Sequence, residues 1–140
     1  MSEVLVASDA RWVHDEVGAV LSGTGFAVRH VNAGTDVLPA VLERETDLVI
    51  LDLQIGNMGA MATCFDLRLE ESGGRLDHLP VLMLLDRRPD VFLARRSEAE
   101  GWLVKPLDPI RLRKAIRALL AGGTYHDESY RPRTVAGSPS

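Results

Sequence analysis

The chain has little cysteine, no excess of positive charge and no long hydrophobic run. Its 140 residues include a single cysteine, Cys64, so no disulfide can form within the chain, which fits a reducing compartment. The net charge of −4 argues against a nucleic-acid-binding surface, because such surfaces usually carry a basic stripe. One basic cluster recurs at helical spacing, and we interpret it as a solvated helix face: Arg111, Arg113, Lys114 and Arg117.

No apolar run approaches the roughly 20 residues that span a bilayer. The N-terminus also lacks the basic region and following apolar stretch of a secretory signal. We therefore expect no membrane insertion and a cytoplasmic location. The balance of 46% hydrophobic and 26% charged residues is that of one globular domain with a core. Cys64 lies among apolar residues of an expected helix, which favours a buried, unreactive thiol.

Segments with strand and helix patterns alternate along the chain. Strands are expected at Val4–Ser8, Phe26–Val31, Leu48–Leu51, Pro80–Leu85 and Trp102–Val104. Helices are expected at Arg11–Leu21, Asp36–Arg44, Ala60–Glu71, Val91–Glu100 and Pro109–Ala121. Five strand–helix units predict an α/β fold, a five-stranded parallel sheet with helices on both faces. The nearly continuous apolar strands agree, because such strands are buried on both sides.

Cap residues and composition indicate where elements and the domain end. Asp9 is a candidate cap of the first helix, and Asp108 of the last, where Pro109 takes the first helical position. Residues 1–121 make up the expected domain. Residues 122–140 are rich in Gly, Ser, Pro and Thr, so we predict a disordered or at most loosely docked tail.

Three polar residues stand at strand ends. Asp52 closes a fully apolar run, Asp9 follows the first strand, and Lys105 follows the fifth. In an open parallel sheet, ligands bind at the carboxyl ends of the strands. The sequence therefore predicts a small polar pocket of two carboxylates and a lysine.

The order and spacing of three segments resemble the receiver domains of two-component response regulators, over about residues 3–121. The segments are Asp47-Leu-Val-Ile-Leu-Asp52, Pro80-Val-Leu-Met-Leu-Leu85 and Trp102-Leu-Val-Lys105-Pro106. The resemblance implies the flavodoxin-like receiver topology. It also implies that Asp52 accepts a phosphoryl group and that Lys105 pairs with the phosphoryl oxygens.

The chain departs from this family at the site. The family's acid pair after the first strand is Ser8-Asp9 here, so one acid is missing. Mg²⁺ needs only one or two carboxylates besides water and phosphate. Asp9, Asp52 and the backbone carbonyl of Gln54 remain as metal ligands, and we expect weaker Mg²⁺ binding than in a full acid cluster. Leu85 stands where the family has a Thr or Ser that contacts the phosphoryl group, and a leucine cannot donate a hydrogen bond.

Two further switch residues allow alternative interpretations. Asp86 replaces a small residue of the family. We favour its facing solvent or capping a turn with Arg87-Arg88-Pro89. Pointing inward, it would repel a phosphoryl group or lend a carboxylate to the metal. Trp102 matches the aromatic residue that often partners the missing Thr. We favour a partly exposed Trp102, and inward packing against Leu85 is the alternative.

We expect an atypical, stand-alone receiver in phosphorelay signalling, without enzymatic activity of its own. A histidine kinase or small phosphodonor would modify Asp52, and the changed surface would bind a downstream protein, with no direct nucleic-acid contact. The alternative is a phosphorylation-independent module. It would dock constitutively, or dimerise, through residues 91–121 with Arg95, Arg96, Trp102, Arg111 and Arg113. A metal-dependent hydrolase using Asp9 and Asp52 is a third reading, with no further base or nucleophile to support it.

Overall fold

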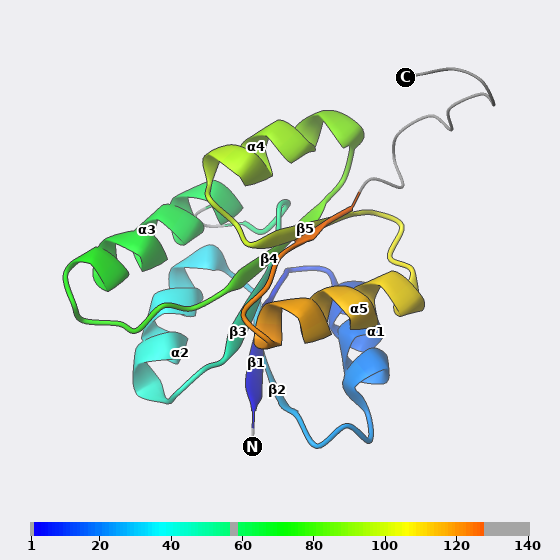
Figure 1. The fold of residues 1–140 in the computed structure, drawn as a ribbon, viewed down its shortest axis with the longest axis horizontal. Coiled ribbons are helices and arrows are strands. Elements are labelled where there is room, and N and C mark those ends of the chain that lie inside the picture. Colours follow the sequence, from blue (N-terminus) through cyan, green and yellow to red (C-terminus); the bar gives the residue numbers. More distant parts are fainter. Residues whose placement is uncertain (1, 57–58, 128–140) are drawn as a thin grey trace.

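The computed structural model describes residues 2–56 and 59–127. These residues form one parallel sheet with the strand order β2-β1-β3-β4-β5-β6 (Figure 1). The strands are β1 (Glu3–Ala7), β2 (Ala27–Val31), β3 (Leu48–Asp52), β4 (Val81–Leu85), β5 (Gly101–Val104) and β6 (Tyr125–His126). The predicted α/β class and the five predicted strands are confirmed, and β6 is a sixth strand that the sequence did not predict.

Helices cover both faces of the sheet. They are α1 (Arg11–Leu21), α2 (Val37–Glu43), α3 (Ala60–Ser72), α4 (Val91–Arg96) and α5 (Pro109–Leu120), with short 3-10 turns at Gly34–Asp36 and Arg88–Asp90. Helices α1 and α5 lie on one face, and α2, α3 and α4 lie on the other (Figure 1). None of the helices in the described ranges is long and apolar enough to cross a membrane.

The central strand β3 shows why the sheet is stable. Its five residues are all buried. Leu48 and Ile50 pack in the core under α1 and α5, whereas Val49 and Leu51 pack in the core under α2, α3 and α4. Because successive side chains of a strand point to opposite faces, an unbroken apolar run is what a doubly covered strand requires. Each buried large aliphatic side chain contributes about 1.5–3 kcal/mol.

Helix α4 ends earlier than the sequence predicts. The expected helix ran to Glu100, but the observed one ends at Arg96. The hydroxyl of Ser97 donates a hydrogen bond to the Leu93 carbonyl oxygen at 2.8 Å, and Glu98 adopts a φ of 58°. A left-handed residue cannot continue a right-handed helix, so the chain leaves the helix here.

The two predicted caps have different outcomes. Asp108 caps α5 as expected, because its Oδ1 accepts a hydrogen bond from the Ile110 N–H at 2.8 Å. The cap assigned to Asp9 is wrong. The residue before α1 is Ala10, and its N–H donates to Ser8 Oγ at 3.0 Å. Ser8 is one residue nearer the buried strand, so its short side chain reaches the helix start from inside the site.

The chain keeps contact with the sheet and α5 beyond residue 121. Gly122 takes a φ of 88° and its N–H donates to the Leu119 carbonyl oxygen at 3.0 Å. The N–H of Gly123 donates to the Ala118 carbonyl oxygen at 2.8 Å, and the chain then runs beside β5 as β6. The tail predicted from residue 122 is therefore docked as far as Asp127. Residues 128–140 lie outside the described ranges.

Candidate functional site

The carboxyl ends of β1, β3 and β5 bring three of the predicted polar positions together. Asp52, at the end of β3, is 1% exposed, and Ser8, after β1, is fully buried. Asp52 Oδ2 accepts a hydrogen bond from the Ser8 hydroxyl at 2.7 Å. Asp52 Oδ1 accepts hydrogen bonds from Lys105 Nζ at 2.7 Å and from the Gln54 N–H at 3.2 Å. Both carboxylate oxygens are therefore held in fixed directions.

Asp86 joins this cluster, although the sequence favoured a solvent-facing position. Its Oδ1 accepts a hydrogen bond from Lys105 Nζ at 2.9 Å. Its Oδ2 is buried and has no hydrogen-bond partner among the described residues. The solvent-facing interpretation is wrong because the ammonium group at the end of β5 attracts a carboxylate at the end of β4. The inward alternative is the one observed.

Lys105 is the only positive charge bonded to these two acids in the described part of the chain. Burial acts to lower the pKa of Lys105, but its hydrogen bonds to Asp52 and Asp86 outweigh burial and raise it. The ammonium group therefore stays charged at neutral pH. The Trp12 ring centroid lies 5.5 Å from Nζ, and Trp12 is 47% exposed, so this indole partly covers the mouth of the site. The Lys105–Pro106 peptide bond is cis.

Asp9 stands apart from the cluster. It is exposed, and within the described ranges no hydrogen bond or ion pair joins it to Asp52 or Lys105. Its Oδ2 lies 3.5 Å from where a Cβ on Gly56 would be, so Asp9 reaches toward the loop after β3. Asp9 thus faces the same loop that carries Gln54.

The oxygen atoms near Asp52 can be compared with the ligands that Mg²⁺ requires. No group of three or more His, Cys, Asp or Glu side chains in residues 2–56 and 59–127 could hold a metal. The oxygen donors around the site are the carboxylate of Asp52, the carboxylate of Asp9 beside the following loop, and the unpartnered Oδ2 of Asp86. Because Mg²⁺ takes much of its coordination from water and phosphate, oxygen donors of this kind are compatible with it in their chemistry.

Leu85 and Trp102 lie beside the site in the core under α2, α3 and α4. Leu85 is fully buried, and Trp102 is 2% exposed. The partly exposed Trp102 that we favoured is wrong, because β6 covers it. The His126 ring stacks on the indole with centroids 4.1 Å apart and planes 3° apart. The inward alternative holds, and the unpredicted strand is the reason.

A histidine pair next to the site was not predicted. His14 Nε2 donates to the Ser8 carbonyl oxygen at 2.8 Å, which leaves His14 Nδ1 as the acceptor of its neutral form. His30 Nδ1 lies 2.7 Å from that atom and donates to it. Burial, then the charge of His14, lowers the pKa of His30, against the opposing effect of Asp15. The two rings come from α1 and β2, and no spacing in the sequence indicates that they meet.

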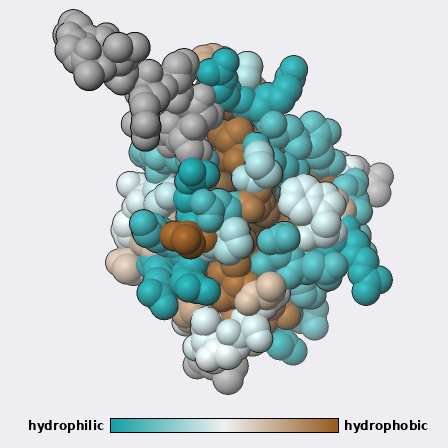
Figure 2. Space-filling view, turned by 90° about the vertical axis from the view of Figure 1, so that its right-hand side faces the viewer, coloured by the Kyte–Doolittle hydropathy of each residue, from teal (hydrophilic) through white to brown (hydrophobic). Residues whose placement is uncertain are grey.

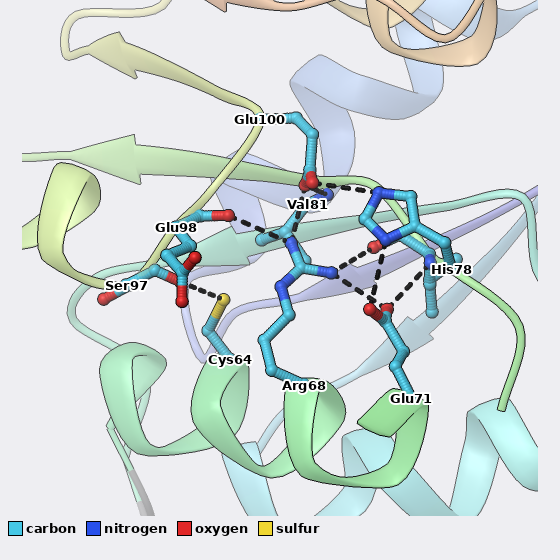
Figure 3. A network of polar contacts seen from close by, with 9 residues as sticks. Cys64, Arg68, Glu71, His78, Val81, Ser97, Glu98 and Glu100 are labelled. Carbon is cyan, nitrogen blue, oxygen red and sulfur yellow. Dashed lines mark hydrogen bonds and ion pairs between the residues drawn. The ribbon is translucent and has the colours of Figure 1, made fainter. Parts of the chain in front are cut away.

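A second unpredicted network centres on Arg68 of α3 (Figure 3). Its guanidinium donates to Glu71 at 2.9 Å, to Glu100 at 2.6 Å, and to the carbonyl oxygens of Leu79 and Glu98. The His78 ring lies between the same two glutamates, at 3.1 Å and 3.0 Å. Glu71 and Glu100 also accept the N–H groups of Leu79 and Val81. This network joins α3 to the start of β4 and the start of β5.

A cationic hollow of about 400 Å³ adjoins the site. Its lining consists of Asp86, Arg87, Arg88, Val104, Lys105, Pro106 and Arg111. The side of the molecule that carries the β5-α5 loop shows a central hydrophobic band flanked by hydrophilic residues (Figure 2). Four of the lining residues are basic and one is acidic, so the hollow favours an anionic group next to Lys105.

Comparisons with known proteins match most of the chain to one family. A family model described as the response regulator receiver domain matches residues 4–117. The chain is 33% identical over 119 residues to the DNA-binding response regulator MtrA of Mycolicibacterium paratuberculosis, covering 84% of this chain and 50% of that protein. It is 31% identical over 119 residues to the transcriptional regulatory protein GltR of Pseudomonas aeruginosa, covering 84% of this chain and 48% of that protein. The chain thus spans about half the length of these curated relatives.

Solved structures show the same fold. The chemotaxis response regulator CheY4 of Vibrio cholerae has a TM-score of 0.75 and 24% identity, over 85% of this chain and 98% of that one. The signal receiver domain of a histidine kinase from Syntrophus aciditrophicus has a TM-score of 0.76 and 23% identity, over 96% and 97%. At these identities the likeness concerns the fold alone.

Proposed function

This chain belongs to the family of response regulator receiver domains, and we propose that it acts as an atypical receiver whose phosphoacceptor is Asp52. The observation that carries the proposal is the carboxylate of Asp52, buried at the end of β3 and hydrogen-bonded to Lys105. The proposed donor is a histidine kinase or a small phosphodonor, and the proposed output is contact with a downstream protein in the cytoplasm. The chain serves as a signalling module rather than an enzyme.

In the proposed transfer, a carboxylate oxygen of Asp52 bonds to the donor's phosphorus. The bond from phosphorus to the donor's leaving atom breaks, and the leaving group departs with that electron pair. Lys105 pairs with a phosphoryl oxygen and balances its charge. The Ser8 hydroxyl keeps Oδ2 oriented, and the basic lining of the adjoining hollow attracts the anionic donor.

Asp9, Asp52 and the Gln54 carbonyl would hold Mg²⁺ in this site. Bound Mg²⁺ supplies positive charge that neutralises the transferring phosphoryl group. Ser8 contributes a hydroxyl where the family has an acid, so we propose weaker Mg²⁺ binding than in a full acid cluster. The carboxylate of Asp86, which Lys105 holds in the site, places a negative charge beside the position of the incoming phosphoryl group and opposes its charge of about −2.

The second candidate function is a phosphorylation-independent interaction module. It is supported by Leu85, which offers no hydrogen bond to a phosphoryl oxygen, and by Trp102, which is already buried. In this module, α4, β5 and α5 would bind a partner or a second copy constitutively. Because β6 lies along β5, that surface would include β6.

The deciding experiment is Mg²⁺-dependent formation of the beryllofluoride adduct, followed by amide NMR, with Asp52→Asn as the isosteric control. Shifts at Asp9, Asp52 and Lys105 that spread to Trp102 and vanish in the control would establish a working switch. Shifts confined to the pocket would indicate binding without signalling. If Mg²⁺ and beryllofluoride change nothing, the phosphoacceptor proposal is rejected and the constitutive module stands.

A further inference from the structure

The outer edge of β5 carries a segment that follows α5. Residues Gly101 and Trp102 pair in parallel with Tyr125 and His126. The Tyr125 N–H donates to the Glu100 carbonyl oxygen, and the Asp127 N–H donates to the Trp102 carbonyl oxygen, both at 3.2 Å. Without this segment, these carbonyl groups of β5 would form an open sheet edge.

Two side chains of the segment add specific contacts to this pairing. The His126 ring stacks on Trp102, and the Arg95 guanidinium lies 5.1 Å from the centroid of the same indole. Asp127 is 3% exposed, and its Oδ2 accepts a hydrogen bond from the Val104 N–H at 2.9 Å. This side-chain bond extends the pairing with β5 by one residue beyond the end of β6. The edge therefore recognises an extended backbone that carries a flat ring followed by a carboxylate.

Gly101 makes room for this segment. A Cβ at this position would come within 2.9 Å of the Tyr125 carbonyl oxygen and within 2.9 Å of Leu119 Cδ1. Real Cβ atoms do not approach so closely, so a side chain at position 101 would push away either β6 or α5. The absence of a side chain here lets the backbone of the segment approach β5.

Among the described residues, the segment forms a short strand. Its pairing with β5 covers two residues, whereas β1 and β2 pair over five. The indole N–H of Trp102 is buried without a hydrogen-bond partner among the described residues. A buried donor without a partner costs free energy, so the packing around this indole is not fully satisfied. Short strands with few buried contacts are also those that open locally.

From these contacts we propose that the outer edge of β5 is a strand-binding surface, occupied in the free chain by the chain's own residues 125–127. Its ligand is an extended segment that pairs in parallel, with a ring over Trp102 and a carboxylate at the Val104 N–H. Residues 125–127 cover this edge until a ligand segment replaces them. The inference does not depend on phosphorylation of Asp52, because none of the residues that form it lies in the phosphoacceptor cluster.

The first test uses the full chain with Trp12→Phe, so that Trp102 is the sole reporter of tryptophan fluorescence. His126→Ala and Asp127→Ala are compared with Thr124→Ala, an exposed neighbour, as the matched control. Both test variants should shift Trp102 emission to longer wavelength. Asp127→Ala, which removes the acceptor of the Val104 N–H, should also speed hydrogen exchange of that amide by about tenfold, the loss of one charge-assisted hydrogen bond. Unchanged emission and exchange would overturn the proposal.

The second test adds the capped peptide Gly-Gly-Thr-Tyr-His-Asp to the full-length Asp127→Ala chain. The peptide should restore the emission and the Val104 protection saturably, and a peptide with alanines in place of His and Asp should not. Failure of the first peptide to restore either signal would mean that the segment is a fixed part of the sheet. Val104 protection that rises with protein concentration in the wild-type chain would also overturn the proposal, because a second copy would then supply the segment.

Discussion

Lys105 Nζ lies 2.7 Å from Asp52 Oδ1 and uses the same ammonium group to hold Asp86 at 2.9 Å. The charge that would meet a phosphoryl group is therefore shared with a second carboxylate before any donor arrives. At an effective dielectric constant near 20, two like charges a few ångströms apart repel by a few kcal/mol at most. Asp86 thus weakens the site electrostatically, unless its free oxygen serves the metal.

Asp86→Asn distinguishes these two roles. The amide keeps the shape of the side chain but removes its charge, so we expect beryllofluoride with Mg²⁺ to bind about tenfold more tightly, a gain of about 1.4 kcal/mol. Titration followed by amide NMR measures the affinity. Asp77→Asn, an exposed acid away from the site, is the matched control. Weaker binding in Asp86→Asn would instead make Asp86 a ligand of the metal.

Arg68→Met should destabilise the fold strongly. Arg68 is 15% exposed, and its removal leaves Glu71 and Glu100 partly buried without their guanidinium partner. We expect the free energy of unfolding to fall by about 3 kcal/mol in urea titrations.

The control for this variant is Arg75→Met. Arg75 pairs with Glu70 on the surface, where its side chain is 63% exposed. Its loss should change the free energy of unfolding by about 0.5 kcal/mol or less. Equal effects of the two substitutions would show that the Arg68 network contributes no more than a surface ion pair.

The pair of His14 and His30 predicts how stability depends on pH. Because the pKa of His30 is lowered in the folded chain, the folded state binds fewer protons there than the unfolded state, whose histidine pKa is about 6.5. The contribution of neutral His30 to the free energy of unfolding is complete above about pH 6.5. It is lost as the pH falls below that value. Asp15 opposes this effect from α1.

The measurement is the urea midpoint at pH 7.5 and pH 5.5 in the wild-type chain and in His30→Asn. The wild-type midpoint should fall more on acidification than that of the variant, because the variant has no ring to protonate at that position. Parallel decreases in the two proteins would remove His30 as the source of the pH dependence.

The sequence predicted the parts of the site that local patterns determine. The apolar run ending at Asp52 identifies a doubly buried strand, and parallel strands necessarily bring Asp52 and Lys105 to one edge. It misplaced Asp86 because Arg87-Arg88-Pro89 resembles a turn, whereas a lysine from another strand decides the orientation.

Trp102 was misplaced for a similar reason. Its cover is β6, whose two residues follow Gly122-Gly-Thr124 and are too few to show an alternating pattern. Nothing in that short segment indicates a strand until its pairing partner β5 is known. The histidine pair and the Arg68 network also depend on contacts between distant elements, which single-sequence periodicity does not report.

Cys64 was expected to be buried, and the structure confirms that it is. Burial raises the pKa of its thiol to about 11, and the nearby Arg68 guanidinium offsets this only in part. The Sγ–H donates to the Ser97 carbonyl oxygen at 3.1 Å. Because the thiolate is the reactive form, we expect iodoacetamide to modify the native chain at least about a hundredfold more slowly than the urea-unfolded chain. Mass spectrometry over time measures both rates, and rapid modification of the native chain would contradict a rigidly packed α3.

Arg68→Met should speed the reaction, because loosening α3 from β4 and β5 exposes the thiol more often, whereas Arg75→Met should leave its rate unchanged.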